Sequence, residues 1–175
     1  TIEARDWFTY GHSRKVCKHA LAVAEALELP PERKNLLRTS ALLHDIGKVG
    51  ISDDILRKPG PLTPSEREVI QSHPRLGVSI LRRIPDLRDH LPIILHHHER
   101  YDGTGYPSGL KGEEIPLEAR ILAVADAFDA MTSDRVYRPA FPLEKVMRIM
   151  EDGKDKQWDG KIVDILLEIA PSLTK

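Results

Sequence analysis

The chain has 175 residues, 41% of them hydrophobic and 30% charged, which is enough to build one globular domain with a sizeable core. Its 26 basic and 27 acidic residues give a formal net charge of -1, which excludes a global field that would attract a nucleic acid polymer or an anionic membrane. The single cysteine, Cys17, excludes an intrachain disulfide, and no apolar run approaches the ~18–20 residues that span a bilayer. These features predict a cytoplasmic protein, and the start at Thr1 indicates a piece of a longer chain.

Hydrophobic periodicity predicts helices along most of the chain. The first covers about residues 9–28, and Pro31 is expected to open the second. The second helix carries an apolar stripe from Leu37 through Asp45, and Gly47 is a typical C-terminal stop for it. This stripe ends in the adjacent imidazole of His44 and carboxylate of Asp45, and a carboxylate is costly to bury without a partner.

The middle of the chain begins with a turn at residues 58–61, in the run KPGP. Thr63 and Glu66 then form the T-x-x-E pattern that predicts an N-terminal capping box. The apolar stripe of the helix that follows leads through Val69 to His73.

The rest of the chain is expected to be helical, apart from one loop. Pro74 restarts a helix with Ile80 on its apolar face. The segment 102–116 is too rich in glycine and proline for a regular element, although a short hairpin stays open as an alternative. Further helices are expected at about 91–98, 117–132, 142–152 and 160–170. The fold class predicted is therefore all-α, a single-domain helical bundle.

Five of these helical segments place a metal-capable group where a leucine would be expected. These residues are His12, His19, His44, Asp45, His73, His97, His98 and Asp126. A single histidine on an apolar face is usually a hydrogen-bonded core residue. Two carboxylates and several imidazoles directed at one interior need cations to neutralise and organise them, and this ligand mixture suits Fe, Mn, Zn or Ni. The sequence therefore predicts a metal centre inside the bundle.

The order of several short motifs resembles the HD-GYP branch of the HD metal-dependent phosphohydrolases. The matching runs are GHS at 11–13, HDIGK at 44–48, KPGPLT at 58–63, HHE at 97–99, DGTGYP at 102–107 and the segment 115–138. The resemblance implies an HD-GYP domain over residues 1–175, with its core at about 10–165. It also implies an all-helical HD fold around a metal cluster, and hydrolysis of cyclic di-GMP to linear pGpG or GMP.

The resemblance also implies a ligand set. Carried over position by position, the metal ligands are His12, His44, Asp45, His73, His97, His98 and Asp126. His19 is not among them, so we expect it to be a core residue. Some relatives hold a third metal through a glutamate, but Phe8 stands at that position here, so we expect two divalent ions. Fe or Mn is favoured, and Zn, Ni, Co and Mg stay open.

The implied reaction is in-line attack on phosphorus by a hydroxide that the two ions share. Asp45 is assigned to catalysis as a metal ligand, and Lys48 is assigned to the phosphate, where it would offset developing charge. The alternative for Lys48 is a solvated lysine at the end of its helix.

Candidate substrate contacts lie in two segments. Gly105, Tyr106 and Pro107 are expected at the mouth of the site, with the Tyr106 ring stacking on a base; the alternative is a tight turn with this ring in the core. Arg135 and Arg138 could bind phosphate or guanine edges. Alternatively, these arginines pair with the nearby carboxylates of Asp129 and Asp134.

Three rival functions stay open at this point. The domain could be a catalytically weak cyclic di-GMP receptor or a module that binds a diguanylate cyclase (GGDEF) protein. It could act on another cyclic dinucleotide, such as cyclic GMP-AMP, or on mononucleotides. A receiver or sensor domain is expected before Thr1.

Overall fold

The computed structural model describes residues 11–134 and 139–173 of the chain. Its α-helices are α2 (His12–Ala26), α3 (Pro31–Leu43), α4 (Asp53–Leu56), α5 (Pro64–Gln71), α6 (His73–Leu81), α7 (Leu91–His96), α8 (Leu117–Thr132), α9 (Leu143–Asp152) and α10 (Gly160–Leu173). Short 3-10 helices are η2 (Ile46–Gly50), η3 (Pro85–His90) and η4 (Gly112–Glu114). No strand occurs in these two ranges, so the all-α prediction is confirmed.

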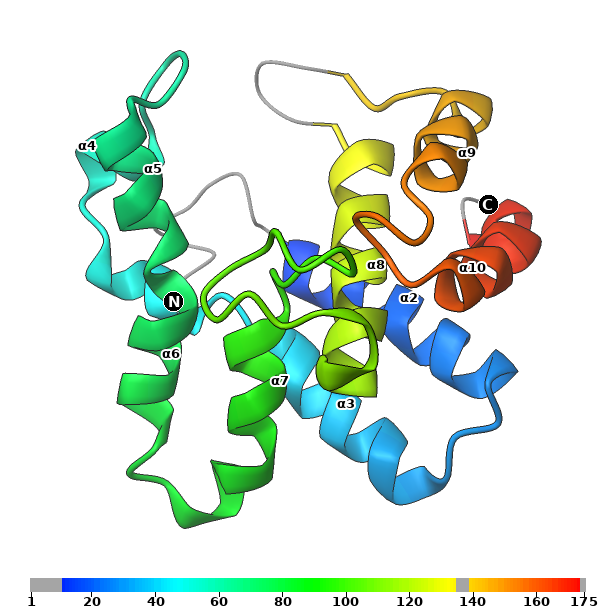
Figure 1. Cartoon of the computed structure of the whole chain (residues 1–175), viewed down its shortest axis with the longest axis horizontal. Helices are drawn as coiled ribbons and strands as arrows, with labels where there is room; N and C mark the ends of the chain where they lie inside the picture. Colours follow the sequence, from blue (N-terminus) through cyan, green and yellow to red (C-terminus); the bar gives the residue numbers. More distant parts are fainter. Residues whose placement is uncertain (1–10, 135–138, 174–175) are drawn as a thin grey trace.

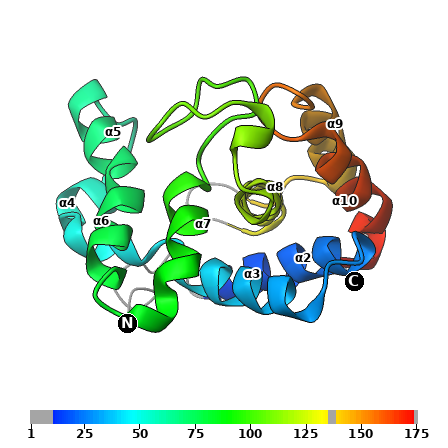
Figure 2. The ribbon, with the colours of Figure 1, turned by 60° about the horizontal axis from the view of Figure 1, so that its bottom comes forward.

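The central element is α8, which contacts α2, α3, α7, α9 and α10. Figure 2 looks nearly along its axis and shows these helices around it. Ile121, Val124 and Phe128 of α8 are fully buried, because this helix is apolar on most sides, as its sequence predicts. On the other side of α7, α6 packs against both α7 and η2, while α4 and α5 extend outward from α6 (Figure 1).

Several boundaries follow the sequence rules directly. Pro31 is the first residue of α3, as expected for a residue that lacks a backbone N–H. The capping box of α5 is confirmed, since the Glu66 amide donates to Thr63 Oγ1 at 3.3 Å and the Thr63 amide donates to Glu66 Oε2 at 2.8 Å.

The second predicted helix ends earlier than expected. His44 is the C-cap of α3, and Asp45 has φ -94° and ψ 6°, outside the α-helical region. Gly47 therefore does not stop α3; it lies within η2. A Cβ atom at Gly47 would lie only 1.8 Å from the carbonyl oxygen of His73, so glycine is needed here for the close approach of η2 to α6.

One alternative that the sequence left open is not realised, and one expectation was wrong. The hairpin considered for 102–116 does not form, and the segment consists of turns and η4. Val69 and Ile80, expected on apolar interior faces, are 39% and 43% exposed, because α5 and α6 are covered on fewer sides than the helices around α8. In the two described ranges, no helix combines the length and apolarity that crossing a membrane requires.

Candidate metal centre

The structure brings all seven predicted ligands together. Their ligand atoms fall into three groups, each within 4.8 Å: His73, His97 and His98; His12, His44 and Asp126; and His44, Asp45 and His97. The second and third groups share His44, and the first and third share His97, so the groups form one continuous cluster. These residues come from α2, the turn after α3, the start of α6, the end of α7 and the middle of α8. Their assignment as ligands is still a prediction, but their positions allow it.

His44 shows why the cluster fits a cation. Its Nδ1–H donates to the Ala41 carbonyl at 2.7 Å, so Nε2 carries the lone pair. This Nε2 is buried and has no hydrogen-bond partner within residues 11–134 and 139–173, although the Asp45 carboxylate lies 3.4 Å away. A buried polar atom without a partner costs roughly 1–3 kcal/mol, and a metal ion would satisfy it.

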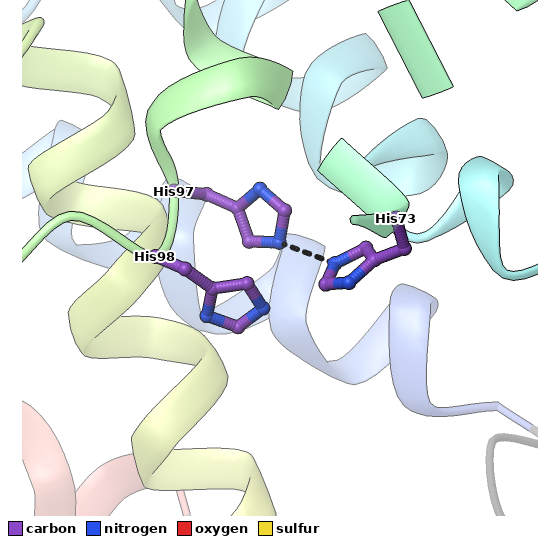
Figure 3. A group of neighbouring side chains, drawn as sticks. All are labelled: His73, His97 and His98. Carbon is purple, nitrogen blue, oxygen red and sulfur yellow. Dashed lines mark hydrogen bonds between the residues drawn. The ribbon is translucent and has the colours of Figure 1, made fainter. Parts of the chain in front are cut away.

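His73 and His97 also use Nδ1 for a backbone carbonyl, and Figure 3 shows the contact between their two rings as a dashed line. The Nδ1–H of His73 donates to the Ile70 carbonyl and that of His97 to the Ile94 carbonyl, both at 2.7 Å. Their Nε2 atoms then face each other at 3.4 Å with lone pairs on both sides. Two facing lone pairs repel unless a proton or a cation lies between them, so this geometry also favours a metal ion.

His12 has a different partner. Its Nε2 lies 3.0 Å from Asp126 Oδ1, and its Nδ1 lies 2.6 Å from Asp129 Oδ2. Burial disfavours the charged imidazole, but the hydrogen bonds to Asp126 and Asp129 and their charges raise the pKa of His12 to about 9. Burial raises the pKa values of both carboxyls, but His12 and the nearby histidines outweigh it and hold them well below the usual range.

The remaining protonation states suit metal binding. Burial lowers the pKa of His98 to about 4, and it also lowers the pKa values of His73 and His97. Burial raises the pKa of Asp45, but the charges of Lys48 and the surrounding histidines outweigh it and hold this pKa well below its usual value. Neutral imidazoles and ionised carboxylates are the forms that bind metal.

Lys48 lies at the edge of the cluster. Its Nζ is 2.8 Å from Asp45 Oδ2, and its side chain is 21% exposed. It is therefore positioned between a predicted ligand and solvent, where an incoming phosphate would meet it. Its contact with phosphate stays a prediction.

Tyr106 covers the cluster from the loop side. Its ring stacks on His98 with centroids 5.0 Å apart and planes at 28°. A Cβ at Gly105 would lie 2.2 Å from the Arg100 amide nitrogen, so this glycine packs directly on the backbone. The Pro107 carbonyl accepts from Arg75 at 2.8 Å. The structure thus gives these loop residues packing contacts, and their roles in substrate binding stay predictions; Arg135 and Arg138 lie outside the described residues.

Glu99 anchors this loop, a role that the sequence reasoning missed. Its buried carboxylate accepts the amides of Ser108 at 2.7 Å and Gly109 at 3.0 Å. The loop is tied on its other side by the Tyr101 amide, which donates to the Gln157 carbonyl at 3.3 Å. The sequence signal was its place in the HHE run at 97–99, directly after two predicted ligands.

Asp129 is the second residue missed as part of the site. The sequence reasoning considered it only as an alternative partner for Arg135 and Arg138, which lie outside the described residues; in the structure its carboxylate meets His12. Its spacing of three residues from Asp126 on a helix was the signal, because such residues share a face.

The sequence profile of the HD domain family matches residues 1–162. The chain belongs to the HD domain family. HD domains are metal-dependent, and the cluster described above supplies groups that could hold metal in this one. The resemblance predicted from the motifs is thereby confirmed.

Relatives of this HD domain carry names of cyclic dinucleotide phosphodiesterases. One is the cyclic di-GMP phosphodiesterase response regulator RpfG of Xanthomonas campestris pv. campestris (strain 8004), 43% identical over 168 residues that cover 95% of this chain and 44% of the relative. Another is the 3'3'-cGAMP-specific phosphodiesterase 3 of Vibrio cholerae serotype O1, 40% identical over 87% of this chain and 33% of the relative. The chain thus spans less than half the length of these relatives.

Among solved structures, the HD domain resembles Bd1817, an HDG"Y"P protein from Bdellovibrio bacteriovorus. The TM-score is 0.75 at 22% identity, and the match covers 91% of this chain and 51% of the other. This likeness supports the fold.

Proposed function

We propose that this HD domain is a metal-dependent phosphodiesterase that hydrolyses cyclic di-GMP to linear pGpG or GMP. The observation that carries the proposal is the cluster of five histidines and two aspartates, four of them buried and three half-buried, all within the three overlapping groups. The RpfG relative, named for cyclic di-GMP and 43% identical over 95% of this chain, supports the substrate.

The ligand set favours two divalent ions, because the cluster has two ends joined in the middle. His12 and Asp126 lie at one end, His73 and His98 lie at the other, and His44 belongs to the group that contains His12. Imidazole with carboxylate favours Fe or Mn, with Zn, Ni, Co and Mg as alternatives. Bound there, divalent ions would supply Lewis acidity and a nucleophile at neutral pH.

The chain's own residues would position the ions, neutralise the phosphate and border the substrate. Asp45 and the imidazoles would fix the cation positions. The lowered pKa values of Asp45, His73, His97 and His98 already favour the forms that bind metal, whereas His12, with its raised pKa, would have to lose a proton. Lys48, at the solvent side of Asp45, would neutralise a phosphate oxygen as negative charge develops. Tyr106 would border the substrate, with one ring face held on His98.

A second substrate has specific support. The Vibrio cholerae relative is named for 3'3'-cGAMP and is 40% identical, close to the value for RpfG. A receptor with little turnover is a further candidate, but the complete set of ligand positions favours hydrolysis. We also infer a receiver or sensor domain in the whole protein, since RpfG is named a response regulator; a diguanylate cyclase partner is a separate prediction.

The test is turnover by protein purified without oxygen and loaded with Fe or Mn. The protein is incubated separately with cyclic di-GMP, 3'3'-cGAMP and a mononucleotide panel, and the products are separated by chromatography. We expect pGpG or GMP from cyclic di-GMP, and no product from an Asp45→Ala variant. Protein that holds two ions and yields no product from any of these substrates would overturn the enzyme assignment in favour of the receptor.

A further inference from the structure

Four of the five candidate ligand histidines have a described partner at Nδ1, and one of the four differs from the rest. In three of them, Nδ1–H donates at 2.7 Å to the backbone carbonyl three residues earlier: His44 to Ala41, His73 to Ile70, and His97 to Ile94. His12 instead has the Asp129 carboxylate at 2.6 Å. A carboxylate partner at Nδ1 is therefore described only at the His12 end of the cluster.

Asp129 is itself held firmly. It is 2% exposed, and its Oδ1 accepts from Ser133 Oγ at 3.0 Å. His19 Nε2 lies 3.7 Å from the same oxygen, and the His19 ring meets Phe128 edge-on. The sequence reasoning left His19 as a core residue; it packs in the core and also faces this carboxylate. Residues of α2 and α8 thus fix Asp129 from both sides.

An ionised acceptor changes what an imidazole offers a metal. A carboxylate at Nδ1 fixes the ring orientation and tautomer, and it increases electron donation from Nε2 more than a neutral carbonyl does. Removing such a partner typically weakens metal binding by about 10–100-fold. The effect should be confined to the ion that the oriented ring touches.

We propose that Asp129 is a positioning residue that strengthens binding of the ion held by His12, His44 and Asp126, and leaves the ion at the His73 end unaffected. The proposal rests on the two-ion centre proposed above. It makes the two ions unequal: only the first depends on the side-chain network between α2 and α8, through His12, whereas His44, His73 and His97 rest on backbone carbonyls.

The test compares Asp129→Asn with Glu118→Gln in the whole chain. Glu118 is a matched control because it is a buried acid on the same helix, paired with Arg33 and about 16 Å along the helix axis from Asp129. Both variants and the wild type are titrated with Mn²⁺ by calorimetry, and bound metal is counted after dialysis at fixed free Mn²⁺. Thermal unfolding without metal measures any general loss of stability.

We expect two ions in the wild type and in Glu118→Gln. In Asp129→Asn, one ion should bind with wild-type affinity and the other about 10–100-fold more weakly. Ser133→Ala keeps the carboxylate but removes one donor to it, so it should weaken the same ion by less. This milder variant also serves if Asp129→Asn does not fold.

Three outcomes would overturn the proposal. If Asp129→Asn binds two ions at wild-type affinity, the role of Asp129 is refuted and the two-ion centre is not. Equal weakening of both ions would show a general structural role. Fewer than two ions in the wild type would refute the two-ion centre itself, which separates that failure from the others.

Discussion

Gly47→Ala is the substitution with the most direct structural consequence. The added Cβ would lie 1.8 Å from the His73 carbonyl oxygen and 2.6 Å from the Gly77 amide nitrogen. Real Cβ atoms essentially never approach other atoms closer than 3.0 Å, so η2 and α6 would have to separate by about 1.2 Å at His73 (3.0 minus 1.8). Both obstacles are backbone atoms, which no rotamer change can remove.

The expected loss of stability follows from this overpacking. Inserting a methyl group into a close-packed interior costs about 1–3 kcal/mol, and we expect the upper end because backbone must move. For a domain of this size, 3 kcal/mol corresponds to a fall in Tm of roughly 6–12 °C. In the wild type, His73 Nε2 lies 3.4 Å from Asp45 Oδ1. The shift would move these two predicted ligands apart, so metal binding should weaken as well.

The assay is thermal and urea unfolding with and without Mn²⁺. Gly50→Ala is the matched control, since it lies in the same short helix and its Cβ would meet only the end of the Leu76 side chain, at 3.2 Å. We expect a change below about 1 kcal/mol for Gly50→Ala, as for a mild overpacking. Equal Tm values for Gly47→Ala and the wild type would refute the argument from close approach.

Four further predictions concern the protonation of His12, the loop that Glu99 anchors and a helix cap. Because the pKa of His12 is about 9 without metal, metal binding at pH 7.5 should displace about one proton from this residue. Calorimetry in buffers of different ionisation enthalpy measures the number of protons released. A number near zero would contradict the prediction. The same raised pKa stabilises the metal-free fold fully below pH 6.5, and urea unfolding should show this contribution disappearing as the pH rises through about 9. In Glu99→Gln the side-chain NH₂ group would face the backbone N–H of Ser108 or Gly109, and two donors cannot bond to each other. Hydrogen exchange at these two backbone amides should therefore accelerate, and KM for cyclic di-GMP should rise while the metal content stays unchanged. Hydrogen-exchange protection equal to that of the wild type would count against the anchoring role. Thr63→Ala removes a confirmed cap and should cost about 1 kcal/mol in urea unfolding, whereas no measurable change would mean that solvent replaces it.

The helices and the candidate ligands could be predicted because both depend on periodicity. An apolar stripe marks the side of a helix that faces the interior, so a histidine in that stripe must point inward wherever the helix packs. This reasoning placed His12, His73 and Asp126 correctly at the cluster without knowledge of how the helices are arranged.

The details that failed depend on contacts between elements. Gly47 follows the local rule for a helix stop, but its role comes from the approach of α6, which no local pattern encodes. The partner of Asp129 depends on how α2 crosses α8, because only that crossing brings His12 to it. The exposure of Val69 likewise depends on which elements cover α5.

The backbone contributes to the site through the direction of three helices. His44 directly follows α3, His97 directly follows α7, and His73 comes two residues after the end of α5. The carboxyl end of a helix carries a partial negative charge from its aligned peptide dipoles, but the amino ends of α2, at His12, and of α6, at His73, lie at the same cluster and carry the opposite sign. What the three carboxyl ends supply is orientation, because the carbonyls of Ala41, Ile70 and Ile94 in their last turns accept the Nδ1–H of His44, His73 and His97. Neutralising Asp45 or Asp126 would therefore weaken the attraction for a cation and leave these three rings aimed by the backbone.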